Sequence, residues 1–478
     1  MGYSAAIYDT IDYDVLREMF VTVQSQGRGT VIRRFCMKER KSLGQLFVPL
    51  CLETLCYMLA EMVDTFMLST LGDAAVGAVG TAATYISVFV IMFSIISYGM
   101  MAVMTQYIGA GKLEVAGQAR RLSIYFNAGL GIVLSLFLLR FSGAVLELVG
   151  VADSLMGYAK AYLGIVGGSC VLYALIPVFS GYLRAFGYTK EPLTATITAN
   201  VVNFILNALF LFRFHWGVQG VAAATVISYG VNLLLVIFYA HRLIRIPKTG
   251  ERLKNSQVFL QILKIGLPSA AETALYNVAM TLIIRFLNQM DPEGLNVTAR
   301  SYTMQITNFA YSVGAALAEA NAILTGWRVG AKQYEACDTG TRKAARIGIA
   351  VAVFLESLFA ISAGLIMRIF TDDPVMIALV GRLLTIDIVL EIGRASNLVF
   401  GQALKASGDA VYPTIIAAIF MYLCAVGGTY FFGIRLGWLA AGAYVGLAMD
   451  ECVRAVCMYR RWKKGKWRTR RLVAERKA

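Results

Sequence analysis

Carboxylates inside apolar segments are the side chains of this sequence that could do chemistry. Glu53, Glu61 and Asp64 lie in one hydrophobic stretch, and on a helix they would fall within an arc of about 80°. An ionisable group costs at least about 2.5 kcal/mol in the middle of a bilayer, so it faces a cavity or a partner by default. Three carboxylates this close cannot all stay ionised easily, and we expect at least one to exchange a proton. Hydrogen bonding to neighbouring helices is the alternative for Glu53 and Glu61.

A second group of charges lies in the apolar stretch from 376 to 404. Asp387, Glu391 and Arg394 are spaced i, i+4 and i+7, so they share a helix face, and an ion pair between Glu391 and Arg394 is predicted. Arg285 and Glu319, in two other apolar stretches, are predicted to form another pair.

Two interpretations of these charges stay open. A buried charge is tolerable when it is paired, so the pairs could be purely structural. Alternatively, Glu272 or Glu391 exchanges partners between an inward-facing and an outward-facing state of a transporter.

The elements that must position these residues are membrane-spanning helices. The chain has 478 residues, of which 58% are hydrophobic and 15% charged, and its mean hydropathy is +0.65. Soluble proteins carry roughly 25% charged residues, and a bilayer is crossed by about 20 apolar residues. Twelve segments meet that length, at about 43–70, 79–107, 120–140, 158–183, 192–213, 218–241, 260–289, 298–327, 343–367, 376–404, 413–433 and 438–460. We predict an all-α integral membrane protein with twelve transmembrane helices.

The net charge of +15 is explained by membrane topology and predicts no nucleic-acid partner. Most Lys and Arg lie in the N-terminal tail, in the connections from even to odd spans and in the C-terminal tail, which is the positive-inside pattern. It predicts a multi-pass protein of the cell membrane with both termini in the cytoplasm. The basic run from Arg460 to Arg471 is either a topology signal or a contact with anionic membrane lipids.

The chain also contains an internal repeat. PLCLETLCY at 49–57 returns as PSAAETALY at 268–276, GAGKLEVA at 109–116 as GAKQYEAC at 330–337, and LRAFGYTKEP at 183–192 as LKASGDAVYP at 404–413. The offsets are 219, 221 and 221 residues, and internal symmetry of this kind is common in secondary transporters. We predict two pseudo-symmetric six-helix lobes, at 43–241 and 260–460, with a binding cavity between them. A cytoplasmic tail at 1–42, a linker at 242–259 and a basic tail at 461–478 complete the predicted organisation.

The repeat and further motifs carry a family resemblance. VDTFMLSTLG at 63–72, QYIGAGKLEVA at 106–116, NFILNALFLF at 203–212 and the two copies of the third repeat form an ordered set. With them the chain, from about 43 to 460, resembles the multidrug and toxic compound extrusion (MATE) family of bacterial efflux transporters. The resemblance implies a monomeric antiporter that expels small organic, often cationic, compounds in exchange for H⁺ or Na⁺, without an organic cofactor.

The resemblance also implies an ion-coupling site. Asp64 follows Pro49 by fifteen residues, as the first-helix Asp of the family does, and Asn203, Asn207 and Thr225 match positions on the fifth and sixth helices. These oxygen-bearing groups would bind Na⁺ or, at the carboxylate, H⁺. Several relatives carry Asp in place of Asn207.

The second lobe departs from the family pattern. Glu272 comes only four residues after Pro268, and Arg394 stands where some relatives have Asp. The carboxylate pair that those relatives have in this lobe is therefore not expected in this chain. The stretch EIGRASN at 391–397 instead resembles a bacterial branch in which Glu and Arg are three residues apart.

Other functions predict different features of the sequence. A flippase of lipid-linked saccharides or another amphiphile, in the same superfamily, would favour a more cationic cavity and often has extra helices. A membrane receptor or scaffold would be expected to carry a soluble sensor or docking domain. An enzyme is not expected, because His215 and His241 lie at span ends and no nucleophile, metal constellation or phosphate-binding loop is evident.

Overall fold

The helices of this chain form because a bilayer leaves the backbone no partner except itself. The computed structural model describes residues 41–148, 150–247, 252–291 and 293–473, and every regular element in these ranges is helical. The predicted N-terminal tail, apart from Lys41 and Ser42, lies outside the described residues, as do part of the linker and the end of the C-terminal tail. The predicted domain boundaries therefore stay predictions, although the all-α architecture is confirmed.

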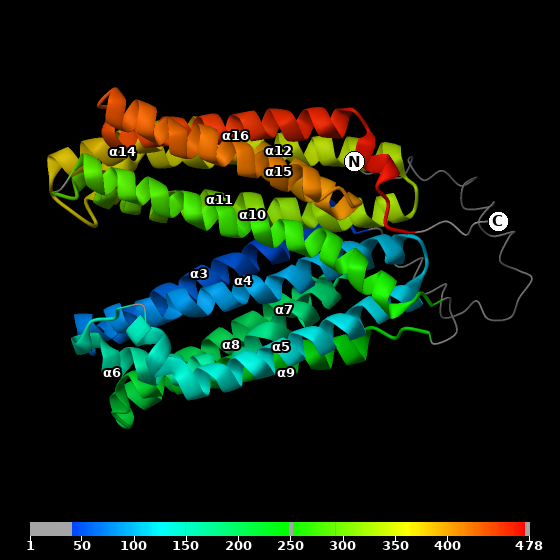
Figure 1. Cartoon of the computed structure of the whole chain (residues 1–478), viewed down its shortest axis with the longest axis horizontal. Coiled ribbons are helices and arrows are strands. Elements are labelled where there is room, and N and C mark those ends of the chain that lie inside the picture. Colours follow the sequence, from blue (N-terminus) through cyan, green and yellow to red (C-terminus); the bar gives the residue numbers. More distant parts are fainter. Residues whose placement is uncertain (1–40, 149, 248–251, 292, 474–478) are drawn as a thin grey trace, which may run out of the picture. The chain divides into compact units, whose positions relative to one another are not determined.

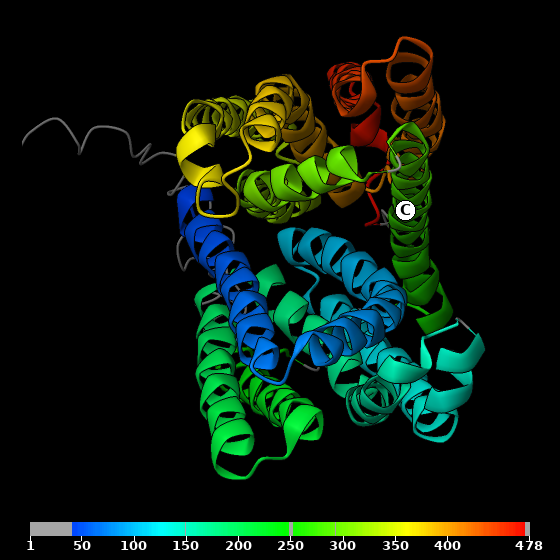
Figure 2. The same ribbon diagram turned by 90° about the vertical axis from the view of Figure 1, so that its left-hand side faces the viewer.

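The first lobe contains six spans (Figures 1 and 2). In chain order its helices are α3 (Leu43–Ser69), α4 (Asp73–Gly109), α5 (Leu113–Leu148), α6 (Asp153–Tyr162) with η1 (Leu163–Gly167) and α7 (Cys170–Ala185), α8 (Lys190–Ala208) with η2 (Leu209–Arg213), and α9 (Gly217–Leu243). The fourth span is one predicted segment that the structure bends by 46° between Gly167 and Cys170. Two consecutive glycines at 167 and 168 account for the bend.

The second lobe repeats this arrangement. Its helices are α10 (Asn255–Met290), α11 (Leu295–Gly330), α12 (Tyr334–Ile361) with α13 (Ala363–Met367), α14 (Pro374–Ser407), α15 (Val411–Phe420) with η3 (Met421–Val426) and η4 (Thr429–Arg435), and α16 (Leu439–Lys463), followed by η5 (Lys466–Thr469). Residues next to both ends of α14 determine where this helix begins and ends. Asp373 caps its first turn by accepting from the Val375 amide, and Gly408, at a φ of 103°, ends it.

In the described ranges, eight helices are long and apolar enough to cross a membrane, or nine when the bent fourth span is counted. The three remaining long helices, α11, α14 and α16, carry buried charges such as Arg300, Asp387 and Arg454. They complete the predicted twelve spans. Large hydrophobic side chains such as Phe66, Leu234 and Leu423 are exposed, as expected of helices that contact lipid.

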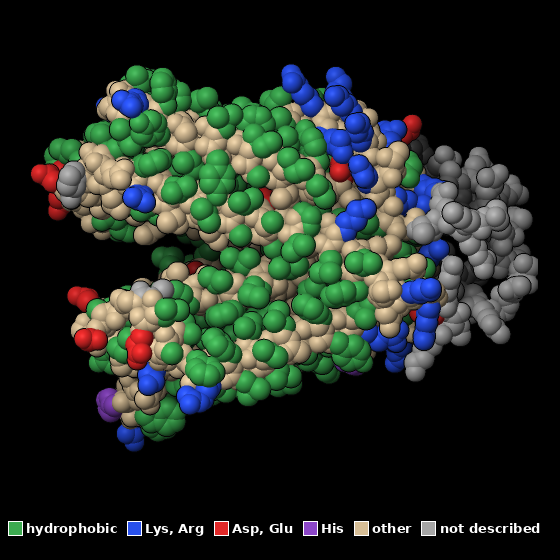
Figure 3. Space-filling model, viewed as in Figure 1, with side chains coloured by type: hydrophobic (Ala, Val, Ile, Leu, Met, Phe, Trp, Pro, Cys, Tyr) green, Lys and Arg blue, Asp and Glu red, His purple; other side chains and the backbone are tan. Residues whose placement is uncertain are grey.

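The two lobes meet along α4, α10 and α11, and α3 also packs on α11. The contact is at the end of the bundle where α3 and α10 begin and α4 and α11 end, which we call the basic end. In Figure 1 the lobes diverge from this end, and Figure 3 shows the surface hollowed between them at the opposite end. Most Lys and Arg side chains visible in Figure 3 gather at the basic end, as the charge pattern of the sequence predicts.

Candidate functional site

Two polar regions lie inside the lobes, one in each. In the first lobe, Asp64 on α3 faces Asn203 and Asn207 on α8. The Asn207 Nδ2 donates to Asp64 Oδ1 at 2.8 Å and to Asn203 Oδ1 at 3.0 Å. The structure thus brings together three of the four residues that the family resemblance implies for ion coupling. The fourth, Thr225 on α9, is buried, and its hydroxyl donates to the carbonyl oxygen of Val221 on its own helix.

This group of side chains fits a hard cation. Asp64 supplies a carboxylate, and the amides of Asn203 and Asn207 supply neutral oxygens, which are the ligands that Na⁺ favours. Oδ1 of Asn207 is buried and has no hydrogen-bond partner in the described part of the chain. A buried acceptor without a partner costs free energy, and a cation coordinated by this oxygen would remove that cost.

The carboxylates predicted on one face of the first helix have different surroundings in the structure. Glu53 is buried and forms an ion pair of 2.8 Å with Arg184 on α7, whereas Glu61 is exposed. Glu53 thus makes a contact with a neighbouring helix, as the alternative predicts, and its role in ion coupling stays a prediction. Arg184 also binds Glu319 on α11 at 2.8 Å, so the ion pair predicted between Glu319 and Arg285 is wrong. Arg285 is exposed on α10.

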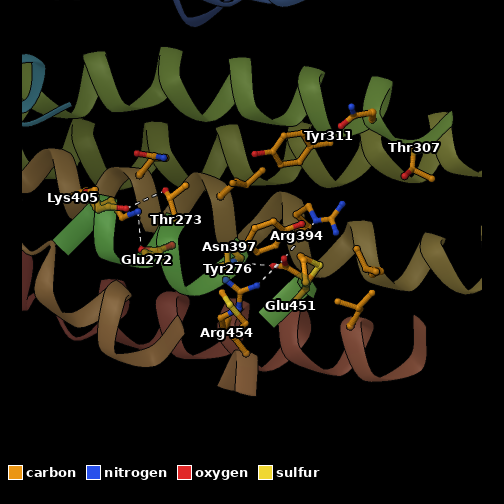
Figure 4. Close-up of a pocket in the computed structure, with 18 of the residues that line it drawn as sticks. Glu272, Thr273, Tyr276, Thr307, Tyr311, Arg394, Asn397, Lys405, Glu451 and Arg454 are labelled. Carbon is orange, nitrogen blue, oxygen red and sulfur yellow. Dashed lines mark hydrogen bonds and ion pairs between the residues drawn. The ribbon is translucent and has the colours of Figure 1, made fainter. Parts of the chain in front are cut away.

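The second polar region surrounds a cavity of about 490 Å³. It lies between α10, α11, α14 and α16 (Figure 4). Tyr98, Met101 and Ala102 of α4, from the first lobe, complete its wall. Its volume is within the usual range of small-molecule sites, about 300–1,000 Å³. Tyrosine and methionine side chains provide much of the lining and offer flat, polarizable surfaces for an organic molecule.

Charged residues around this cavity are mostly paired with one another. Glu272 on α10 binds Lys405 on α14 at 2.9 Å. The predicted pair of Glu391 with Arg394 on α14 is confirmed, and the Arg394 Nε also lies 3.5 Å from Glu451 on α16. Two interior helices are thereby linked through charge.

The network continues along α16. Glu451 accepts from Arg454 at 2.7 Å and from the Asn397 Nδ2 at 2.9 Å, and Arg454 also binds Asp450 at 2.7 Å. Figure 4 shows Arg394, Asn397, Glu451 and Arg454 converging at one wall of the cavity. A chain of alternating charges keeps each buried ion close to an opposite one, which is what makes burial of so many charges tolerable.

Several of these residues were not predicted from the sequence. Asp450, Glu451 and Arg454 lie at i, i+1 and i+4 in an apolar segment, so the spacing rule that identified Glu391 and Arg394 would also have identified them. Glu356 on α12 was missed as well; it is fully buried, and both of its carboxylate oxygens lack a hydrogen-bond partner among the described residues.

Comparison with known proteins gives the family. The MatE family model matches residues 49–209 and 268–431, one match in each lobe. An uncharacterised transporter of Bacillus subtilis is 32% identical over 432 residues, covering 89% of this chain and 94% of that protein. A probable multidrug resistance protein, NorM, of Thermotoga maritima is 24% identical over 470 residues, covering 93% of this chain and 98% of that protein.

Solved structures agree on the fold. An outward-facing multidrug resistance MATE family transporter has a TM-score of 0.83 at 18% identity and covers 93% of this chain and 99% of its own. A MATE crystal structure in a bent conformation has a TM-score of 0.82 at 18% identity, with 89% and 96% covered. Both halves of the sequence repeat match one family model and the twelve-span fold agrees, so this chain belongs to the MatE family of multidrug and toxic compound extrusion transporters and is a multi-pass membrane transporter, not an enzyme.

Proposed function

We propose that this protein is a secondary active efflux transporter that exports small organic compounds, many of them cationic, in exchange for H⁺ or Na⁺. The observation that carries the proposal is the cavity between α10, α11, α14 and α16, which is lined by aromatic and charged residues and bordered by α4 of the other lobe. A site at the boundary between two lobes can change its access when the lobes rock against each other. The names of relatives such as NorM of Thermotoga maritima support the multidrug substrate class.

The orientation is part of the proposal. Lys and Arg gather where the lobes touch, and the surface is hollowed between the lobes at the opposite end (Figure 3). If the basic end faces the cytoplasm of a cell with this protein in its plasma membrane, the state described here is open to the outside. Both termini then lie in the cytoplasm, next to anionic membrane lipids. We also propose that the transporter works as a monomer.

Ion coupling is assigned to the first lobe. When Na⁺ or H⁺ is bound, it neutralises the Asp64 carboxylate inside the membrane. Asn207 orients that carboxylate through its 2.8 Å hydrogen bond, and Asn203 holds Asn207 in place. Exchange of one monovalent organic cation for one proton moves no net charge, so it would draw on the pH gradient alone, about 1.4 kcal/mol per pH unit. Neutral or anionic substrates would also draw on the membrane potential, about 2.3 kcal/mol per 100 mV.

A flippase of an anionic amphiphile is the second candidate, and one observation favours it. The cavity lining contains four basic residues, Arg300, Arg394, Lys405 and Arg454, against the three acids Glu272, Asp387 and Glu451. Three of the four basic residues are already bound to carboxylates, however, and the remaining basic residue, Arg300, is matched in number by Asp387, which has no ion-pair partner in the described ranges. This balance favours efflux of small molecules over transport of a polyanionic lipid headgroup.

The experiment that tests the proposal is ethidium efflux from reconstituted vesicles, driven separately by a pH gradient and a Na⁺ gradient. We expect one gradient to drive efflux in the wild type and Asp64→Asn to abolish it. Asp153→Asn is the control, because Asp153 is an exposed carboxylate at the start of α6. Full gradient-driven efflux by Asp64→Asn would contradict the coupling site, and efflux under neither gradient by folded wild type would contradict the antiport mechanism.

A further inference from the structure

Two of the charged residues that line the second-lobe cavity have no ion-pair partner in the described ranges. Of the seven charged lining residues, Lys405 is bound to Glu272, and Arg394, Glu451 and Arg454 belong to the network between α14 and α16. Arg300 on α11 and Asp387 on α14 remain. The cavity therefore presents one guanidinium and one carboxyl group that have no ion-pair partner among the described residues.

Arg300 is buried although its charge is unpaired. Its residue is 6% exposed, and its Nε has no hydrogen-bond partner within the described segments. The contact made by its Nη2 is with the Met280 sulfur at 3.7 Å, and a thioether is a weak acceptor. A buried guanidinium without a carboxylate is strongly unfavourable in a membrane, so a functional ligand is the expected reason for keeping it.

Asp387 is the complementary group. It is 2% exposed, it lines the same cavity, and its Oδ2 has no hydrogen-bond partner in the part of the chain described. Arg394, the cation nearest along its helix, is already bonded to Glu391 and Glu451. Tyr444 on α16 lines the cavity too and lies near both Asp387 and Arg300.

We propose that this cavity binds a zwitterionic organic molecule, whose carboxylate is held by Arg300 and whose cationic group is held at Asp387. The guanidinium fork of arginine matches a carboxylate with two parallel hydrogen bonds. A delocalised cation beside Asp387 would also contact the aromatic ring of Tyr444, because such rings attract cations. This inference rests on the proposed efflux function and narrows its substrate class.

The test compares two dyes that differ by one charge. Rhodamine B carries a carboxylate and a delocalised cation, whereas its ethyl ester carries only the cation. Binding to the purified full-length protein in detergent is measured by fluorescence polarisation, and efflux from reconstituted vesicles is measured in parallel. We expect Arg300→Met to weaken binding of rhodamine B by about tenfold or more, because a charge-assisted hydrogen bond is lost. Binding of the ester should change less than twofold.

Matched variants separate this effect from a general loss of structure. Arg285→Met removes an arginine exposed on α10 and should leave the affinities for both dyes unchanged. Arg300→Lys keeps the charge but loses the fork, so an intermediate affinity for rhodamine B is expected. Asp387→Asn should weaken the binding of both dyes, since both carry the cation. Retained binding of the ester by Arg300→Met shows that this variant is folded.

Three outcomes would overturn the inference. They are unchanged rhodamine B binding by Arg300→Met, an equal loss of both dyes in that variant, and a wild type that binds the ester but not rhodamine B. Failure of the proposed efflux function is recognised separately, as absence of ethidium efflux by the wild type under either gradient.

Discussion

Gly109 at the end of α4 and Gly330 at the end of α11 each face the backbone of the other's helix. A Cβ placed on Gly109 would lie 2.1 Å from the carbonyl oxygen of Trp327, and one on Gly330 would lie 2.0 Å from that of Gln106. The two contacts are related by the same offset of 221 residues as the sequence repeat. This contact between the lobes at the basic end is therefore made twice by one repeated pattern.

Alanine at either position should push the lobes apart at the basic end. Overpacking costs about 1–3 kcal/mol, and here the obstacle is backbone, which cannot turn away. We expect Gly330→Ala and Gly109→Ala to lower the Tm in detergent by similar amounts. Gly129→Ala on α5, where a Cβ would meet nothing within 4 Å, should keep or raise the Tm. Equal Tm values for all three variants would show that this close contact is unimportant.

The ion pair between Arg184 and Glu319 also joins the lobes, at 2.8 Å, and both side chains are partly exposed. Such a pair contributes about 1 kcal/mol or less, which corresponds to at most about a fivefold change in population. If the lobes separate here during transport, Glu319→Gln should increase the rate at which a maleimide reagent labels a cysteine placed at Ala102, by a few-fold. Arg184→Gln should be more harmful, because it leaves the buried Glu53 without its partner. Unchanged labelling by Glu319→Gln would exclude a gating role for the pair.

The hydrogen bond from Asn207 to Asp64 is expected to matter for ion coupling. Asn207→Leu should reduce ion-driven ethidium efflux by about tenfold, because a hydrogen bond to a charged group is lost. Asn200→Leu is the matched control: Asn200 is on the same helix and donates to the carbonyl oxygen of Cys56 on α3 at 2.9 Å, away from the carboxylate. It should reduce the Tm without a comparable loss of coupling. Similar efflux from the two variants would argue against a special role for Asn207.

The charge network on α16 should dominate the stability of the second lobe. Arg454 is 6% exposed and binds Asp450 and Glu451, so Arg454→Met should cost about 3–5 kcal/mol and lower the Tm by several degrees. Adding Asp450→Asn should recover part of that loss, since one uncompensated carboxylate is removed.

The control for this prediction is Arg342→Met at the basic end. Arg342 binds Asp338 at 2.9 Å, but both side chains are about one-third exposed, so the expected cost is under about 1 kcal/mol. A Tm for Arg454→Met equal to that of Arg342→Met would mean that the buried network contributes little.

The amino-acid sequence by itself determined the spans, the two lobes and contacts within single helices. Apolar length fixes a transmembrane helix because a backbone in lipid must satisfy its own hydrogen bonds. The pair of Glu391 with Arg394 was predictable for the same local reason, since residues three apart share a helix face. The bend between α6 and α7 was not anticipated, although the glycines that permit it are visible in the sequence.

Contacts between helices were decided only by the tertiary structure. The sequence offered several arginines for Glu53 and Glu319, and packing selected Arg184, which lies between α3 and α11. Glu451 meets Arg394 for the same reason, across two helices whose rotation no local pattern specifies. Rotation of each helix about its axis depends on side-chain packing with its neighbours, so it is a property of the whole assembled bundle. That rotation is also what leaves Arg300 and Asp387 facing a cavity without ion-pair partners among the described residues.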